Sequence, residues 1–151
     1  MPAGKIHAMA SIVTAASAGA ALYFNNLASL TSSCNVAGGA LLGVLVSPDL
    51  DLMENGNYSM VILRARSYYL AEIWRLFWWP YARLSKHRGV SHWPIIGTLL
   101  RVIYIIIIYF ILAIVLSLIG IRVPLYFDPL APYIAGLMLA DFVHIVMDSI
   151  F

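Results

Sequence analysis

The feature that most constrains this chain is an apolar stretch over residues 94–121, centred on four consecutive isoleucines at 105–108. A membrane-spanning helix needs about 20 predominantly apolar residues, and this stretch is longer than that. A soluble domain of this size would keep roughly a third of its chain surface in water. The whole chain of 151 residues is 62% hydrophobic and only 11% charged, which leaves too little charge to cover such a surface. We therefore expect a protein that is partly surrounded by lipid.

Other segments complete a helical pattern. Residues 8–30 are apolar and rich in small side chains, which suits close packing inside a helix bundle. Residues 35–46 are apolar but short for a full span, and Pro48 follows them closely. Residues 133–151 form a further apolar helix after a proline-rich loop.

The middle of the chain has a different character. Between residues 52 and 92, basic side chains alternate with Trp and Tyr, which is typical of a helix in the membrane interface. The pattern predicts an all-α membrane protein, a bundle of about four transmembrane or membrane-embedded helices plus an interfacial amphipathic helix. The length favours a single domain over residues 1–151.

The positive charges are distributed unevenly. The net charge of +2 is too small to indicate a nucleic-acid partner. If the helices run up and down, one side carries eight basic residues and the other carries Arg122; the eight are Lys5, Arg64, Arg66, Arg75, Arg83, Lys86, Arg88 and Arg101. The positive-inside rule places the basic side in the cytoplasm.

All four histidines fall near that same basic side. His7 opens the first helix, His87 and His92 precede the third span, and His144 lies in the last helix. Asp49 and Asp51 follow the second apolar segment on the same side. An up-and-down path therefore gathers residues that are far apart in sequence, and imidazole and carboxylate are both ligands of first-row metals.

The last helix provides a geometric argument for a metal. Asp141, His144 and Asp148 stand at i, i+3 and i+7, which places them along one stripe of a helix. A carboxylate at the centre of a bilayer costs about 2.5–3.5 kcal/mol on insertion scales, so these groups need partners inside the bundle. One to three divalent ions, zinc first by ligand type, would satisfy them. A purely structural hydrogen-bond network is the alternative.

Two residues beside the histidines are interpreted separately. Arg88 is a candidate for binding an anionic group such as phosphate, because the guanidinium pairs with two oxygens at once. The alternative is that it serves only as a positive-inside anchor. Ser91 lies between the two histidine positions, but no general base for it is visible in the sequence.

The order of these motifs resembles a known family. His7, the piece Ser47-Pro48-Asp49-Leu50-Asp51, the piece His87-Arg88-Gly89-Val90-Ser91-His92, and His144 with Asp148 are similar to those of small bacterial integral membrane metal-binding proteins. That family resembles the YdjM-like, LexA-regulated membrane-bound metal-dependent hydrolases and, remotely, zinc-dependent phospholipase C and the zinc nucleases. The resemblance implies a bacterial plasma-membrane location and a ligand set of His7, Asp49, Asp51, His87, His92, His144 and Asp148. Asp141 joins the candidates only through the helical stripe.

Two functions remain open from the sequence. The first is a membrane-embedded hydrolase that cleaves a phosphoester or lipid headgroup at the cytoplasmic face, with Asp51 bridging metals and Arg88 holding the anionic substrate. The second is a non-enzymatic metal-binding protein, either a homo-oligomer or an accessory subunit of a larger membrane complex, in which the ion stabilises the fold. A metal transporter is less favoured, because the ligands cluster at one face and not near the midplane.

Overall fold

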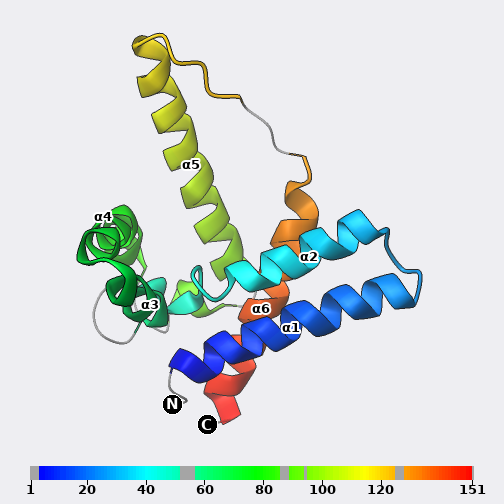
Figure 1. The fold of residues 1–151 in the computed structure, drawn as a ribbon. Helices are drawn as coiled ribbons and strands as arrows, with labels where there is room; N and C mark the ends of the chain where they lie inside the picture. The colour runs from blue at the N-terminus through cyan, green and yellow to red at the C-terminus, as the bar shows by residue number, and fades with distance from the viewer. Residues whose placement is uncertain (1–3, 52–56, 86–88, 94, 125–127, 151) are drawn as a thin grey trace.

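A computed structural model describes residues 4–51, 57–85, 89–93, 95–124 and 128–150. All regular secondary structure among these residues is helical, with no strand (Figure 1). The elements are α1 (Gly4–Phe24), α2 (Leu30–Leu42), η1 (Pro48–Asp51), α3 (Tyr58–Arg66), α4 (Tyr68–Leu84), η2 (Val90–His92), α5 (Ile96–Leu118) and α6 (Leu130–Ile150), where η marks a short 3-10 helix. The predicted all-α fold is confirmed.

Three of the described helices are long and apolar enough to cross a membrane, namely α1, α5 and α6. The expected first span was longer at its C-terminal end than α1 is. The helix stops at Phe24 because Asn26 adopts a left-handed conformation with φ 54°, and Ser29 then caps the start of α2. The helix α2 has 13 residues and a length of about 20 Å at 1.5 Å per residue, which is too short to span a bilayer.

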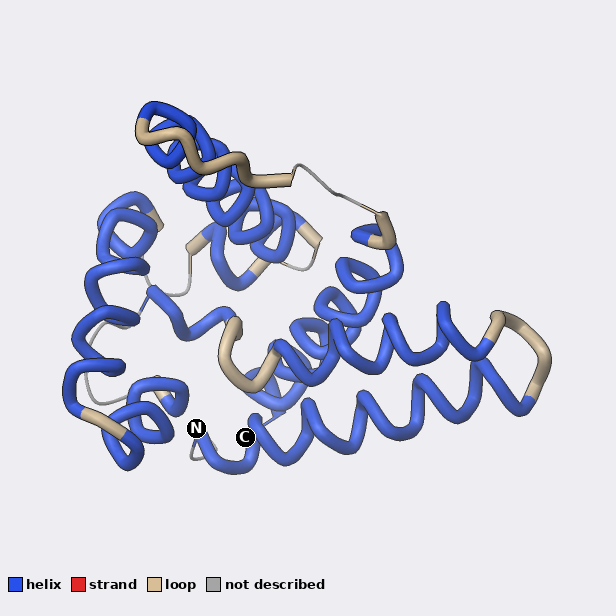
Figure 2. Tube along the Cα trace, turned by 45° about the horizontal axis from the view of Figure 1, so that its top comes forward, coloured by secondary structure: helices blue, strands red, loops and turns tan. Residues whose placement is uncertain are grey.

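The backbones of α2 and α6 touch. A Cβ atom added to Gly136 would lie 1.9 Å from the carbonyl oxygen of Val36, and one added to Gly39 would lie 2.0 Å from that of Tyr133. Only glycine permits this approach, and small residues at helix contacts are typical of membrane bundles. Figures 1 and 2 show α1 and α2 side by side, with α6 crossing them. Their contact holds η1, which follows α2, against α6.

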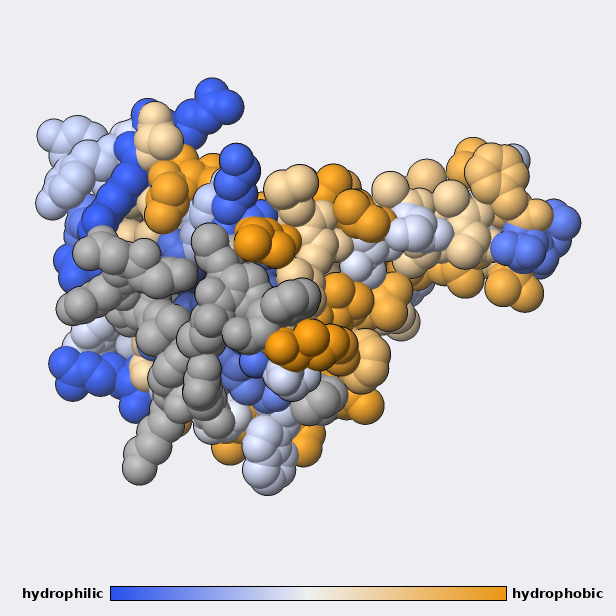
Figure 3. Space-filling view, turned by 90° about the horizontal axis from the view of Figure 1, so that it is seen from below, coloured by the Kyte–Doolittle hydropathy of each residue, from blue (hydrophilic) through white to orange (hydrophobic). Residues whose placement is uncertain are grey.

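The basic and aromatic middle segment forms two helices, not one. Ser67 is extended at φ −165° and ψ 133°, and it separates α3 from α4. The indole nitrogen of Trp74 donates a hydrogen bond of 3.0 Å to the hydroxyl of Ser59, which joins the two helices. In Figure 3, hydrophilic residues gather on the side of α3 and α4, and hydrophobic ones lie along the α1–α2 pair.

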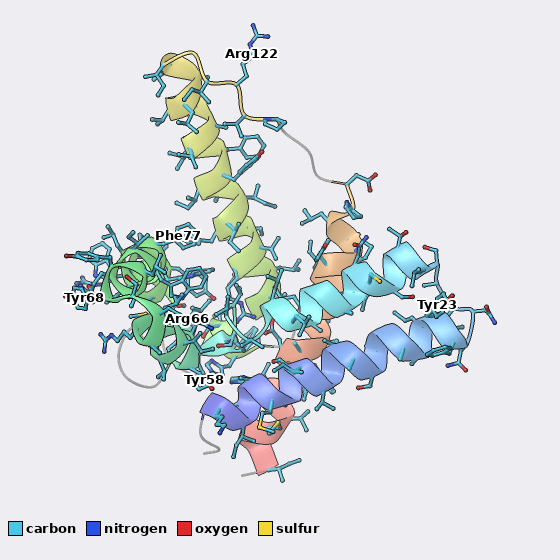
Figure 4. The ribbon with its side chains drawn as sticks, in the orientation of Figure 1. Tyr23, Tyr58, Arg66, Tyr68, Phe77 and Arg122 are labelled. Carbon is cyan, nitrogen blue, oxygen red and sulfur yellow. The ribbon has the colours of Figure 1, made fainter. Side chains whose placement is uncertain are left out.

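Helix α5 stands apart from the rest of the bundle (Figure 1). Only 6% of the apolar part of α5 is buried inside the protein, compared with 33% for α1 and 28% for α6. Its first turns pack on α4 through Trp78, Tyr81 and Tyr104, whose rings lie 5.4–5.7 Å apart. Arg122 lies beyond its far end, well away from Arg66 (Figure 4). Most of α5 therefore needs an apolar environment outside this chain.

Candidate metal centre

Four side chains from three elements meet at one end of the bundle. Asp49 comes from η1, His92 from η2, and His144 and Asp148 from α6. Each offers one ligand atom, and these atoms all lie within 4.8 Å of one another. His144 and Asp148 are four residues apart on a helix, so they share one face. The expected convergence of distant residues is present for these four.

The pairwise contacts within this set are short. Asp49 presents Oδ1 to Nε2 of His92 at 3.6 Å and Oδ2 to Nε2 of His144 at 3.5 Å. Nε2 of His144 also lies 3.4 Å from Oδ2 of Asp148. Two atoms that each bind one zinc ion at about 2 Å are at most about 4 Å apart. The three contacts above meet this limit, and the full set, with its atoms within 4.8 Å of one another, is slightly wider than a single bound ion would hold it.

His7 lies directly beside the four. Its Nε2 is 3.1 Å from Oδ1 of Asp148, and its ring stacks on that of His144 with centroids 3.9 Å apart. The residue is buried in the first turns of α1. His7 therefore either supplies a further ligand or orients Asp148 and His144.

Asp51 contacts the opposite edge of His92. Its Oδ2 accepts a hydrogen bond of 2.7 Å from the hydroxyl of Ser91 and lies 3.8 Å from Nδ1 of His92. The hydroxyl of Ser91 is itself 3.2 Å from that Nδ1. Ligand histidines are commonly fixed by a carboxylate or another acceptor at their second nitrogen. The structure thus puts Asp51 behind His92 and not within the group of four.

Gly97 determines how close η2 can come to α5. A Cβ atom at this position would lie 2.1 Å from the carbonyl oxygen of Ser91. The absence of a side chain lets the backbone of η2 rest on the first turn of α5, and His92 is the last residue of η2. Ser91 is also a residue whose role the sequence did not reveal.

The electrostatics of Asp49 suit a ligand. Burial alone would raise the pKa of its carboxyl group, but the contacts with His144 and His92 outweigh burial and hold the pKa well below its usual range. Asp49 is therefore an anion at neutral pH. A metal ligand must be deprotonated, and this carboxylate already is.

The site passes a simple test for a cation. Within the described part of the chain, the buried Nε2 of His144 and Oδ1 of Asp148 have no hydrogen-bond partner of good geometry. Leaving such atoms unsatisfied costs about 1–3 kcal/mol each, and more for charged groups. Nitrogen and oxygen ligands of this kind fit zinc and other first-row divalent ions.

Asp141 has a different environment from the rest of its stripe. Its Oδ2 accepts hydrogen bonds from Arg101 and Thr98 of α5, and it forms a buried ion pair with Arg101. The sequence predicts Arg101 only as one of the basic residues of one face, and this ion pair is an additional finding of the structure. The signal in the sequence was an arginine in one apolar helix and aspartates in another, because each buried charge needs a partner in a low-dielectric environment.

Two of the expected site residues, His87 and Arg88, lie outside the described residues, as does Lys86. The described candidates are thus Asp49, His92, His144 and Asp148 in one group, with His7 and Asp51 at its edges and Asp141 in a separate ion pair.

The fold and the site together define a helical protein with a candidate His/Asp metal site at one end. Residues 2–127 match the family described as "Uncharacterized metal-binding protein (DUF2227)". The chain belongs to this family. The match contains His7, Asp49 and His92 and ends before α6, which supplies His144 and Asp148.

Similarity to other proteins covers only part of the chain. An uncharacterized protein of Aquifex aeolicus (strain VF5) is 35% identical over 68 residues, which are 44% of this chain and 41% of that protein. The chain thus spans about two fifths of the length of the curated relative it matches. No solved structure matches it significantly.

Proposed function

We propose that this protein is a membrane-embedded, metal-dependent hydrolase that cleaves a phosphoester at the cytoplasmic face of a bacterial plasma membrane. The observation that carries the proposal is the group Asp49, His92, His144 and Asp148, which lies at the basic end of three helices of spanning length. The resemblance of the motifs to membrane-bound metal-dependent hydrolases supports the same reaction class.

The ligand chemistry favours catalysis. Closed structural zinc sites are built mainly from Cys and His, whereas catalytic sites often combine His with a carboxylate. Here two imidazoles and two carboxylates form the group, and Cys34 is exposed on α2. The side chains of His92 and Asp148 keep 11% and 13% of their surface exposed.

We assign the residues three roles in this reaction. Asp49, His92, His144 and Asp148 would hold a divalent cation, zinc first, and the cation would supply Lewis acidity toward a phosphoryl oxygen. Asp51 and Ser91 fix the orientation of His92 through its Nδ1. Arg88 binds the anionic group of the substrate.

The membrane orientation follows from charge. The described basic residues Lys5, Arg64, Arg66, Arg75 and Arg83 belong to α1, α3 and α4, whereas Arg122 lies beyond the far end of α5 (Figure 4). The positive-inside rule then gives a cytoplasmic metal centre. The active site of such a hydrolase would lie at the same depth in the bilayer as the lipid headgroups.

One experiment tests both metal and turnover. The detergent-purified chain is analysed for bound metals, then assayed on bis-p-nitrophenyl phosphate and on vesicles that contain phosphatidic acid. We expect a stoichiometric divalent metal, turnover that is lost on chelation, and loss of both in the double variant His92→Ala, His144→Ala. Asp128→Asn is the matched control, since Asp128 is exposed and precedes α6 at the opposite end of that helix. Metal-loaded protein that hydrolyses neither substrate overturns the enzymatic proposal.

A non-enzymatic role is the second candidate. The four ligands come from segments separated by up to 99 residues, Asp49 to Asp148, so an ion would hold η1, η2 and α6 together. The free energy of metal binding would then stabilise the fold. The chain would be a homo-oligomer or an accessory subunit, and its partner would cover the exposed α5. A metal coordinated only by protein atoms in X-ray absorption spectra, together with no turnover, would favour this role.

A further inference from the structure

A groove separate from the metal centre lies between α4, η2 and α5. Its volume is ≈ 520 Å³, within the range of about 300–1,000 Å³ that is typical of small-molecule sites. On α5 the groove is lined by Leu100, Ile103, Tyr104 and Ile107, which stand at i, i+3, i+4 and i+7 and share one face. The lining is almost entirely apolar.

The groove exists because α5 leans away from the bundle and only its first turns pack on α4. The hydroxyl of Tyr104 donates a hydrogen bond to the carbonyl oxygen of Phe77, which fixes the spacing of the two helices there. Ile103 and Ile107 remain 50% and 51% exposed within this chain. Seven residues of helix rise by about 10 Å, so the apolar strip has the length of several methylene groups.

The base of the groove is the segment that carries the metal centre. Gly89 and Val90 line the groove, and the next two residues, Ser91 and His92, contact Asp51 and Asp49. Tyr81 also lines the groove and lies close enough to Asp51 to interact with it electrostatically. Burial raises the pKa of the Tyr81 hydroxyl, Arg101 opposes this rise, and Asp51 adds to it. A short 3-10 helix thus separates an apolar groove from a cluster of metal ligands.

Basic side chains lie on α4, which forms one wall of the groove, and on the preceding α3; none of them is among the described residues that line the groove, but they favour an anionic amphiphile beside it. Four described cations lie on α3 and α4 against one anion; they are Arg64, Arg66, Arg75 and Arg83 against Glu72. Basic residues at this level of a membrane attract anionic headgroups at about 1 kcal/mol each. A neutral lipid gains nothing from them.

We infer that this groove holds one acyl chain of a phosphate-bearing membrane lipid whose headgroup lies toward the metal centre. The inference rests on the proposed function for the fate of the headgroup, because it makes an acylated phosphoester the substrate class. It concerns binding by residues of α4, η2 and α5 that do not belong to the ligand group.

Photocrosslinking tests the inference on the full chain in phosphatidylcholine vesicles. The probe is phosphatidic acid with a diazirine in one acyl chain, and the labelled peptides are mapped by mass spectrometry. We expect labelling of the α5 peptide that contains Ile103 and Ile107, with competition by unlabelled phosphatidic acid. A diacylglycerol with the same diazirine chain is expected to label this peptide much less.

A matched pair of variants locates the chain. Ile103→Trp fills the groove and is expected to lower the labelling about tenfold, the effect of displacing roughly two buried methylenes. Leu112→Trp adds the same ring to a residue of α5 that is equally exposed at 51% and does not line the groove, and it should leave labelling unchanged. Metal content, measured in parallel, verifies that both variants fold.

Several outcomes overturn the inference. They are equal labelling by the diacylglycerol, an unaltered yield in Ile103→Trp, or competition by inorganic phosphate as effective as by phosphatidic acid. Saturable groove labelling without hydrolysis would support acyl-chain binding in the groove and refute the proposed hydrolase activity. Hydrolysis of soluble phosphoesters without groove labelling would support the hydrolase and refute lipid binding in the groove.

Discussion

Arg101 on α5 and Asp141 on α6 form an ion pair that is enclosed between the two helices, with 0% and 2% of these residues exposed. Neither charge is tolerable alone in an apolar helix. The pair links α5, the least buried of the three helices of spanning length, to α6, which carries two of the four candidate ligands. Thr98 donates a further hydrogen bond to the same carboxylate. The pair therefore positions α5 and, with it, the segment η2 that rests on its first turn.

Removing one member of this pair should destabilise the protein strongly. Arg101→Leu leaves Asp141 buried without its counter-ion, which costs about 3–5 kcal/mol in comparable buried pairs. The double variant Arg101→Leu, Asp141→Leu should recover most of that loss, because no charge remains buried. Unfolding by SDS titration in mixed micelles, followed by circular dichroism, measures the cycle. Additive losses in the double variant would show that the two residues do not act as a pair.

Asp141 and Asp148 should differ in their effect on metal binding. Asp148→Asn removes a ligand oxygen from the group of four, so bound metal should fall below one ion per chain. Asp141→Asn alters only the ion pair with Arg101, so the stoichiometry should be retained even if stability falls. Elemental analysis of the folded fraction separates the cases. Loss of metal in Asp141→Asn alone would place Asp141 among the ligands, as its position in the stripe suggested.

Ser91 should affect affinity and not stoichiometry. Ser91→Ala removes a hydroxyl that contacts both Asp51 and Nδ1 of His92, so His92 loses part of its orientation. Comparable changes behind a ligand histidine weaken metal binding by about 10–100-fold. Competition with a chromophoric zinc chelator measures the dissociation constant. Ser117→Ala is the control, since Ser117 is exposed near the far end of α5, and equal affinities in the two variants would contradict a positioning role.

The contact of α2 with α6 should be needed to assemble the site. Gly136→Leu forces the helices apart, because even a Cβ atom would meet Val36 O at 1.9 Å, and this moves Asp49 away from His144. We expect a loss of about 3 kcal/mol or more and weakened metal binding. Ala135→Leu makes a similar change at the neighbouring exposed position and should be nearly neutral. Thermal unfolding in detergent and metal titration test the pair, and similar behaviour of the two variants would refute the close contact.

Acid should destabilise the metal-free protein partly through Asp49. Its contacts with His144 and His92 hold the pKa of Asp49 below that of an unfolded aspartate, about 3.9. The associated stability is therefore complete above about pH 4 and is lost as the pH falls toward the folded pKa. The chelator-treated protein should lose stability over this range, and Asp49→Asn should lose less of it. Identical acid profiles for the two proteins would show that Asp49 is not held as an anion.

The sequence by itself determined the class of the protein and most of its candidate ligands. Periodicity and hydropathy are local properties, so the apolar stretch over residues 94–121 already required a helix in an apolar environment. The spacing of His144 and Asp148 is fixed by the geometry of a single helix. The match to a metal-binding family agrees with that interpretation of the motifs.

Only the tertiary structure decided which groups share a site. The stripe Asp141, His144 and Asp148 is regular in sequence, yet Asp141 faces Arg101 while His144 faces Asp49, because α5 and η1 pack against different turns of α6. Asp49 and Asp51 are two residues apart in a 3-10 helix and lie at different edges of His92. Such assignments depend on the close approach of backbones at Gly97 and Gly136, and contacts between distant segments leave no periodic signal in a single sequence.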